Sequence, residues 1–251
     1  MSNFKKVLIC CPTADVKNYC FREWIKNVMN FSYPNFQIRL FDNSSDKGAN
    51  AVRLNKYVEE HYGDVGIDKK FYCQNSLIIN ASKEVDNLPK MTMSHNDCRT
   101  YAMKHGYEYI LHLESDVFPQ TNIIETLMVH KKQVVGAVYY RGFGINRSAM
   151  LQKFVSLAYN SGKTLNFTAD EDVYFLDGSL KQTAHAGLGC VLIHTNVFKK
   201  IKFRYVKDKM MHPDSYFAED TNLHKIKIFA DTSCIASHDN EGWGIYGIDW
   251  K

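Results

Sequence analysis

Several common catalytic motifs are absent from this sequence. It contains no Walker phosphate loop, no GxGxxG dinucleotide fingerprint and no HExxH pair, and its seven cysteines form no CxxC pair. These absences argue against a kinase, a dehydrogenase and a zinc protease. No apolar segment near the N-terminus is long enough for a signal peptide or a membrane span, so we expect a cytoplasmic protein with reduced thiols.

The sequence also has no large excess of charge of either sign. The formal net charge of +4 is a small surplus of 31 basic over 27 acidic residues, without the clustered positive charge of a dedicated nucleic-acid binder. Hydrophobic residues make up 45% of the 251-residue chain, which is enough for a full core. We expect one domain over 1–251, with halves at 1–130 and 131–251.

Short apolar runs alternate with amphipathic stretches between residues 6 and 130, which predicts strands joined by helices in a mostly parallel α/β sheet. The expected strands cover 7–11, 37–41, 71–74, 109–113, 133–140, 187–191 and 227–230. The expected helices cover 21–29, 49–61, 94–105 and 196–201, with another opened by Thr121 or Asn122. Residues 142–186 break this pattern and are expected to form a lid or inserted lobe.

An apolar strand ends abruptly in Glu114-Ser115-Asp116. Ligands of open parallel sheets gather at the carboxyl ends of strands, and residues two apart on a strand point to the same side. We therefore expect Glu114 and Asp116 to share a hard divalent cation, Mn²⁺ or Mg²⁺, that would bridge a substrate diphosphate. An ordinary acidic turn would have the same sequence.

Four further residues are candidates for nucleotide contacts. Asp42 follows the expected strand at 37–41, and a carboxylate there would contact a base or a ribose. Helix capping is the alternative explanation for the polar residues after it. Pro12 and Thr13 end the first strand at the same sheet edge. Arg99, in the helix before Glu114, would reach a phosphate or the acids, although a surface arginine looks identical.

The last third of the chain adds two candidates. Glu219-Asp220 sits at an expected helix start, where carboxylates either favour the dipole or supply a general base for an acceptor hydroxyl. His238 follows a strand-like stretch, and a neutral imidazole would complete a carboxylate site for manganese, although it is one of ten histidines. Residues 241–244 after it have the glycines and the aromatic ring of a closing loop.

Taken in order, these elements resemble the GT-A fold glycosyltransferases, particularly the family 2-like members, over nearly the whole chain. The resemblance implies a Rossmann-like, three-layer α/β/α fold and a role for each matching position. Nucleoside and donor contacts match Pro12, Thr13, Asp42, Arg99, Glu114 and Ser115, metal ligands match Asp116 and His238, and the ED motif with the general base matches Glu219 and Asp220. The first acid of the family's DxD motif is a glutamate here, so Asp116 is the firmer ligand.

The resemblance implies a metal-dependent transfer of sugar from a nucleotide sugar, with a UDP-sugar as the expected donor, and single displacement with inversion. A retaining outcome stays open. The acceptor stays open among a glycan precursor, a protein and modified bases in DNA. The competing functions are a nucleotidyltransferase acting on sugar phosphates, although the glycine-rich basic loop of that class is absent after the first strand, and a non-catalytic sugar-nucleotide binding protein.

Overall fold

Ten strands join in one sheet in the computed structural model of the chain, which describes residues 4–46, 48–63, 77–79, 87–141, 148–149, 176–185, 187–207, 209 and 211–239. The strands are β1 (Val7–Thr13), β2 (Phe36–Asp42), β3 (Leu77–Ile79), β4 (Tyr109–Leu113), β5 (Val117–Phe118), β6 (Val134–Arg141), β7 (Ser148–Ala149), β8 (Leu180–Thr183), β9 (Cys190–His194) and β10 (Ile228–His238). The helical elements are the 3₁₀ turns η1 (Asp15–Lys17) and η6 (Thr195–Lys199), the π-turn η2 (Glu59–Gly63), and the α-helices α1 (Asn18–Met29), α2 (Ala49–Val58), α3 (Asn87–Lys104), α4 (Ile123–Met128) and α6 (Pro213–Leu223).

The main path of the sheet runs β3-β2-β1-β4-β9-β6-β10-β5. Strands β3, β2, β1 and β4 are mutually parallel, as are β6 and β10, whereas β9 is antiparallel to both of its neighbours. The prediction of an α/β fold around a mostly parallel central sheet is confirmed. The antiparallel direction of β9 was not predicted, because it depends on pairing with β4 and β6, which are distant in the sequence, and not on local pattern.

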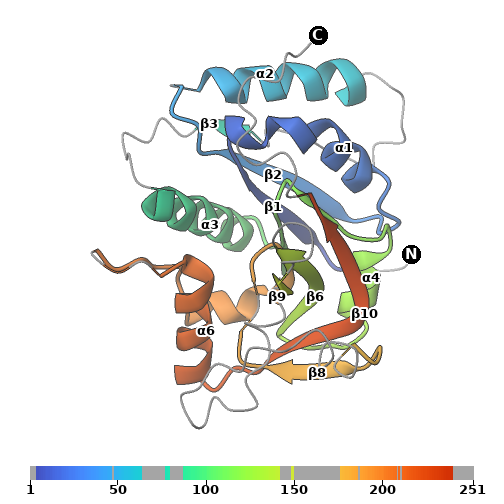
Figure 1. Cartoon of the computed structure of the whole chain (residues 1–251), viewed down its shortest axis with the longest axis vertical. Helices are drawn as coiled ribbons and strands as arrows, with labels where there is room; N and C mark the ends of the chain where they lie inside the picture. Colours follow the sequence, from blue (N-terminus) through green and yellow to red (C-terminus); the bar gives the residue numbers. More distant parts are fainter. Residues whose placement is uncertain are drawn as a thin grey trace.

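Helices cover both faces of the sheet, which produces three layers (Figure 1). On one face α1, α2 and α4 pack through side chains such as Trp24, Leu54 and Leu127, and on the other face α3, η6 and α6 pack through Ala102, Phe198 and Phe217. Helix α1 illustrates why: its buried residues recur at the three- and four-residue spacing of one helix face. Both faces of β1 are buried, which explains its continuous apolar sequence.

Most expected elements coincide with observed ones, with differences at their ends. Helix α3 begins at Asn87, well before the predicted start at 94, since Pro89 is tolerated in a first turn. Strand β9 begins at Cys190 and not at 187. The strand predicted at 71–74, almost all of the lid predicted at 142–186 and the loop at 241–244 lie outside the described residues. Within the described part of the chain, no helix has the length and apolarity to cross a membrane.

Candidate functional site

The candidate site lies where β1, β2 and β4 end, with the end of β10 beside them. Strands β1, β2 and β4 are parallel, so their carboxyl ends meet at one edge of the sheet. Strand β10 extends beyond its pairing with β6 and then pairs antiparallel with β5, which sets His238 opposite Val117. The backbone N–H of Asp239 also donates to the carbonyl of Asp116 over 2.8 Å. The topology thus brings residues 116 and 238 together from distant parts of the chain.

Glu114 and Asp116 converge through a turn and not through strand alternation. Strand β4 ends at Leu113, and the N–H of Val117 donates to the carbonyl of Glu114 over 3.1 Å to close the turn. The N–H of Glu114 in turn donates to the carbonyl of Gly189 over 3.0 Å. The sequence-based reasoning of two side chains on one strand face was therefore wrong, although the two acids do lie together.

Asp116 is fully buried and faces two cationic or polar partners. The ammonium of Lys17 lies 3.0 Å from its Oδ1 and 3.3 Å from Oε2 of Glu114, and Nε2 of His238 lies 3.4 Å from its Oδ2. Burial alone would raise the pKa of Asp116, but Lys17 and His238 outweigh it and lower that pKa. Burial likewise opposes the charge of Lys17, and the two acids outweigh it and raise its pKa. At neutral pH Asp116 is therefore a carboxylate and Lys17 an ammonium ion.

A divalent cation fits this donor set. One ligand atom from each of Glu114, Asp116 and His238 lies within 4.8 Å of the others. Two carboxylates with an imidazole are suitable ligands for manganese, and the position of the Lys17 ammonium shows that the acids attract a cation. An ion entering here would have to displace that ammonium. Lys17 was not predicted, because a lysine at a helix start after a strand has no distinguishing pattern.

A tyrosine forms one wall of the site beside His238. The ring of Tyr139 meets the imidazole of His238 edge to face, with centroids 5.6 Å apart, and its hydroxyl accepts a hydrogen bond of 3.0 Å from the N–H of Gly189. A Cβ at Gly189 would lie 2.5 Å from the Tyr139 ring, which requires glycine there. Tyr139 and Gly189 thus fix one side of the imidazole.

Thr13 and Ser115 connect the ends of β1 and β4. Their hydroxyls lie 3.1 Å apart, and both side chains are buried. Pro12 is tolerated because the pairing of β1 with β4 stops at Cys10, so no partner there needs its missing N–H. The structure places all three at the predicted sheet edge, and nucleoside contact by them stays a prediction.

Asp42 lies at the end of β2 in register with Thr13. Its Oδ1 accepts from the N–H of Ser44 at 3.2 Å, the hydroxyl of Ser44 at 2.6 Å and the amide of Asn50 at 3.1 Å. These bonds organise the loop before α2, as the capping alternative proposed. They engage one carboxylate oxygen, so a nucleoside contact through Oδ2 stays a prediction.

Arg99 lies on α3 and contacts the turn that follows β9. Its Nε donates to the carbonyl of Ile201 over 3.0 Å, and its Nη2 donates to that of Phe198 over 2.6 Å. Burial lowers the pKa of this guanidinium. The contacts favour a structural role for Arg99 over the phosphate contact that the sequence suggested.

Glu219 and Asp220 lie in the middle of α6, which begins at Pro213. A dipole effect at the helix start therefore does not explain them. Arg204 instead holds both: its Nε and Nη2 each lie 3.0 Å from a different oxygen of Asp220, and Nη2 lies 3.0 Å from Oε2 of Glu219. Arg204 would have to move before Asp220 could accept a proton.

Another acid on α6 was not predicted. Asp214 lies in the first turn of the helix, its Oδ2 is 3.7 Å from Nε2 of His185, and both side chains are largely buried. Burial raises the pKa of Tyr139, and the charges of Glu114 and Asp214 raise it further. An Asp after Pro at a helix start looks like an ordinary cap, which explains why the sequence did not indicate it.

Comparison with known proteins shows similarity of fold alone. No protein-family model matches the chain, and no curated protein matches its sequence. Among solved structures, the chain is similar to the GalNAc-T7 structure with UDP, GalNAc and Mn²⁺, at a TM-score of 0.59 and 10% identity, covering 97% of this chain and 46% of that one. It is also similar to A197 from STIV, at a TM-score of 0.48 and 14% identity over 94% and 87% of the two chains. The α/β fold of this chain is therefore GT-A-like.

Proposed function

We propose that the chain is a glycosyltransferase that moves a sugar from a nucleotide sugar to a hydroxyl acceptor, with Mn²⁺ or Mg²⁺ held by Asp116 and His238. The observation that carries the proposal is the convergence of Glu114, Asp116 and His238 at the carboxyl edge of a GT-A-like sheet. The similar GalNAc-T7 structure contains UDP and Mn²⁺, which supports a UDP-sugar as donor. We also propose that the chain is a family 2-like member and that Glu114-Ser115-Asp116 is its DxD motif.

Each part of the site has a role in this reaction. Thr13, Asp42 and Ser115 would hold the nucleoside and the start of the diphosphate at the ends of β1, β2 and β4. A bound divalent ion supplies positive charge to the diphosphate as it leaves. Lys17, displaced from the two acids, would add a second positive charge beside that diphosphate. Tyr139 holds the imidazole of His238 in place.

The transfer itself needs a base. The acceptor oxygen attacks the anomeric carbon, the bond from that carbon to the diphosphate oxygen breaks, and the hydroxyl proton passes to a carboxylate. We assign this role to Asp220, once Arg204 has released it. Asp214 is the alternative, because it lies in the first turn of the same helix and its charge acts on Tyr139. Inversion follows if one displacement completes the reaction.

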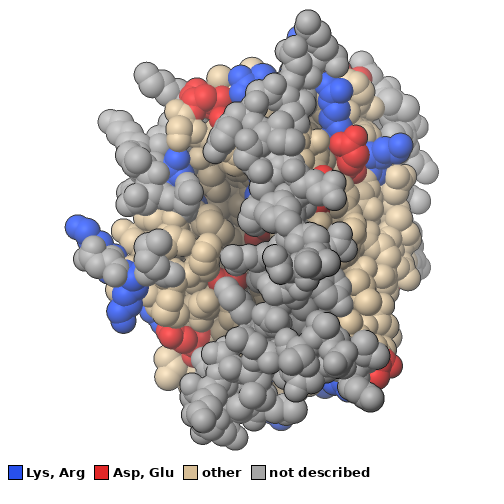
Figure 2. Space-filling model, in the orientation of Figure 1, with Lys and Arg blue, Asp and Glu red and all other residues tan. Residues whose placement is uncertain are grey.

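The acceptor is the open part of the proposal. In Figure 2 basic and acidic side chains lie together around the rim of this face, and further acidic ones lie near its centre, among the residues that the structure describes. DNA is bound chiefly through clustered positive charge, so this face favours a sugar or protein acceptor over modified DNA bases.

Release of nucleoside diphosphate from a panel of sugar nucleotides, with and without Mn²⁺, tests the proposal. We expect Mn²⁺-dependent release of nucleoside diphosphate by the wild type, a loss of at least about 10²-fold in Asp116→Asn, and normal rates in Asp177→Asn, an exposed acid on the loop before β8. Formation of nucleoside triphosphate and sugar phosphate from sugar nucleotide and pyrophosphate would instead show a nucleotidyltransferase. If the protein binds a sugar nucleotide but shows no turnover with any acceptor class, it is a non-catalytic binding protein.

A further inference from the structure

A second group of side chains with metal-binding chemistry lies inside the protein, between the sheet and α3. Cys10 on β1 and His112 on β4 are register partners on neighbouring parallel strands, so their side chains leave the sheet on the same face. His95 and Cys98 are three residues apart on α3, which places them on one helix face above those strands. All four side chains are at most 1% exposed.

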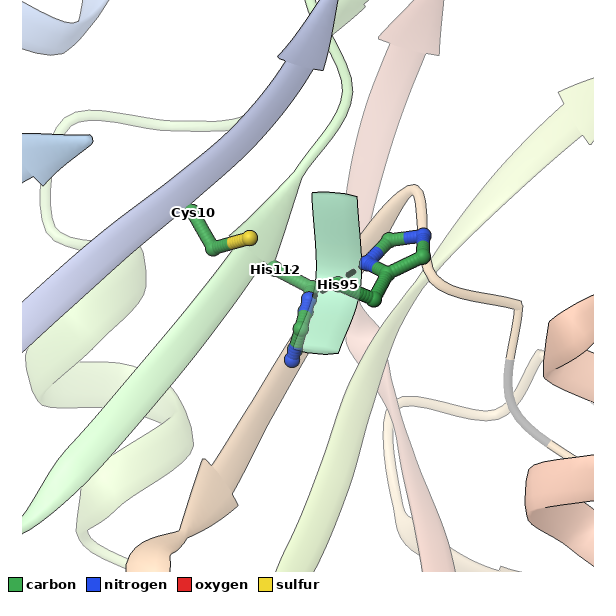
Figure 3. A group of neighbouring side chains, drawn as sticks. All are labelled: Cys10, His95 and His112. Carbon is green, nitrogen blue, oxygen red and sulfur yellow. Dashed lines mark hydrogen bonds between the residues drawn. The ribbon is translucent and has the colours of Figure 1, made fainter. Parts of the chain in front are cut away.

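The donor atoms of three of these four residues converge. One ligand atom from each of Cys10, His95 and His112 lies within 4.8 Å of the others, and the two histidines point toward each other with their Nδ1 atoms 3.1 Å apart (Figure 3). Two nitrogens on one tetrahedral zinc ion would be about 3.3 Å apart, since Zn–N bonds are about 2.0–2.1 Å. Cys98 is not one of these three converging donors, so its thiol, which adds to the effect of burial in raising the pKa of Cys10, would have to turn toward a bound ion. Both cysteines are free thiols.

A hydrogen-bonded histidine pair does not account for this cluster by itself. The surrounding residues are apolar: the Phe203 ring lies 5.0 Å from that of His95 and 5.3 Å from that of His112. Two imidazoles and two thiols in an apolar layer therefore need a further reason to be there.

We propose that Cys10, His95, Cys98 and His112 bind a structural zinc ion that joins β1, β4 and α3 behind the candidate site. Two thiols and two imidazoles are a usual ligand set for a closed tetrahedral zinc site. On binding, each thiol loses one proton to solvent, so the Zn²⁺ ion and two thiolates sum to zero charge, as an apolar layer requires. Neutral imidazoles add no charge, and burial lowers the pKa of His95 to about 4.

The zinc site is distinct from the Glu114, Asp116 and His238 group in its chemistry and does not depend on the proposed function. That group offers oxygen and nitrogen donors, which suit manganese or magnesium, whereas thiolates select zinc. His112 lies two residues before Glu114 on the strand that leads into the acidic turn. A zinc ion there would hold β4 in place against β1 and α3.

The first measurement is the metal content of the full chain, purified without chelators and then dialysed against EDTA to remove weakly bound ions. We expect about one zinc ion per chain, with X-ray absorption at the zinc edge showing two sulfur neighbours at about 2.3 Å and two nitrogen neighbours at about 2.0 Å. Both readouts use the wild type, so no variant has to fold. A zinc content below about a tenth of an equivalent, or a shell with no sulfur, would overturn the proposal.

Cobalt substitution assigns the ligands. Wild-type protein refolded with Co²⁺ should show an intense near-ultraviolet thiolate-to-cobalt absorption, which Cys10→Ser and His95→Gln each reduce severalfold. Cys190→Ser, a buried cysteine in the other core layer, and Asp116→Asn should leave the band at wild-type intensity. Loss of the band in Asp116→Asn, or its persistence in Cys10→Ser, would contradict the assignment.

Discussion

We expect the ammonium of Lys17 to compete with a divalent cation for the carboxylates of Glu114 and Asp116. Its ammonium is 3.0 Å from Asp116 and 3.3 Å from Glu114, with 23% of the side chain exposed. In an effective dielectric of about 20, two unit charges 3.0 Å apart attract by about 5.5 kcal/mol. Partial exposure and desolvation reduce this value, and if a quarter survives, about 1.4 kcal/mol opposes any ion that displaces the ammonium, which is tenfold in Kd.

Lys17→Met should therefore have two measurable effects. Without metal it leaves Asp116 buried without its ammonium partner, which costs about 3–5 kcal/mol of stability and lowers the melting temperature by roughly 6 to 20 °C. With Mn²⁺ much of this loss should be recovered, because the ion replaces the missing charge. Mn²⁺ affinity without nucleotide, measured by electron paramagnetic resonance, should rise about tenfold.

Lys26→Met, an exposed lysine on α1, is the matched control and should change neither quantity. Weaker Mn²⁺ binding in Lys17→Met than in the wild type would refute the competition between ammonium and metal. Equal melting temperatures without metal would show that Lys17 does not neutralise Asp116 in solution.

Four further substitutions test other parts of the site. Gly189→Ala should cost about 1–3 kcal/mol and weaken Mn²⁺ binding, because its Cβ would meet the Tyr139 ring at 2.5 Å; unchanged binding by calorimetry would remove Tyr139 from the site. Arg99→Leu should lower stability by about 1–3 kcal/mol in urea unfolding with UDP affinity unchanged, whereas a weaker UDP affinity in the folded variant would restore the phosphate contact. Asp220→Asn should reduce kcat by at least about 10²-fold with donor affinity nearly constant. If Asp214→Asn shows that loss instead, the base is Asp214.

Local pattern was sufficient for most elements of the sheet. Strands β1, β2 and β4 are buried on both faces, and such strands appear in sequence as short continuous apolar runs. The first and last residues of the elements were harder to predict from the sequence. The start of α3 at Asn87 and the start of β9 at Cys190 depend on turns whose hydrogen bonds come from distant residues, such as the bond between Glu114 and Gly189.

The sequence predicted candidate site residues only where polar or charged side chains directly follow a strand. Asp116 and His238 were paired by the family resemblance, and the structure brings them together through the pairing of β5 with β10. Lys17 and Arg204 could not be predicted, because their importance lies in which acids they reach across the fold. A single lysine or arginine in a turn carries no local signature of such a partner.

A crystal of the chain soaked with UDP and Mn²⁺ tests the central claim most directly. We expect a manganese anomalous peak between a carboxylate oxygen of Asp116 and Nε2 of His238, with the diphosphate of UDP on the ion and Lys17 moved off the two acids. An ordered UDP with no manganese peak at Asp116, and the Lys17 ammonium still between Glu114 and Asp116, would contradict the metal-dependent mechanism.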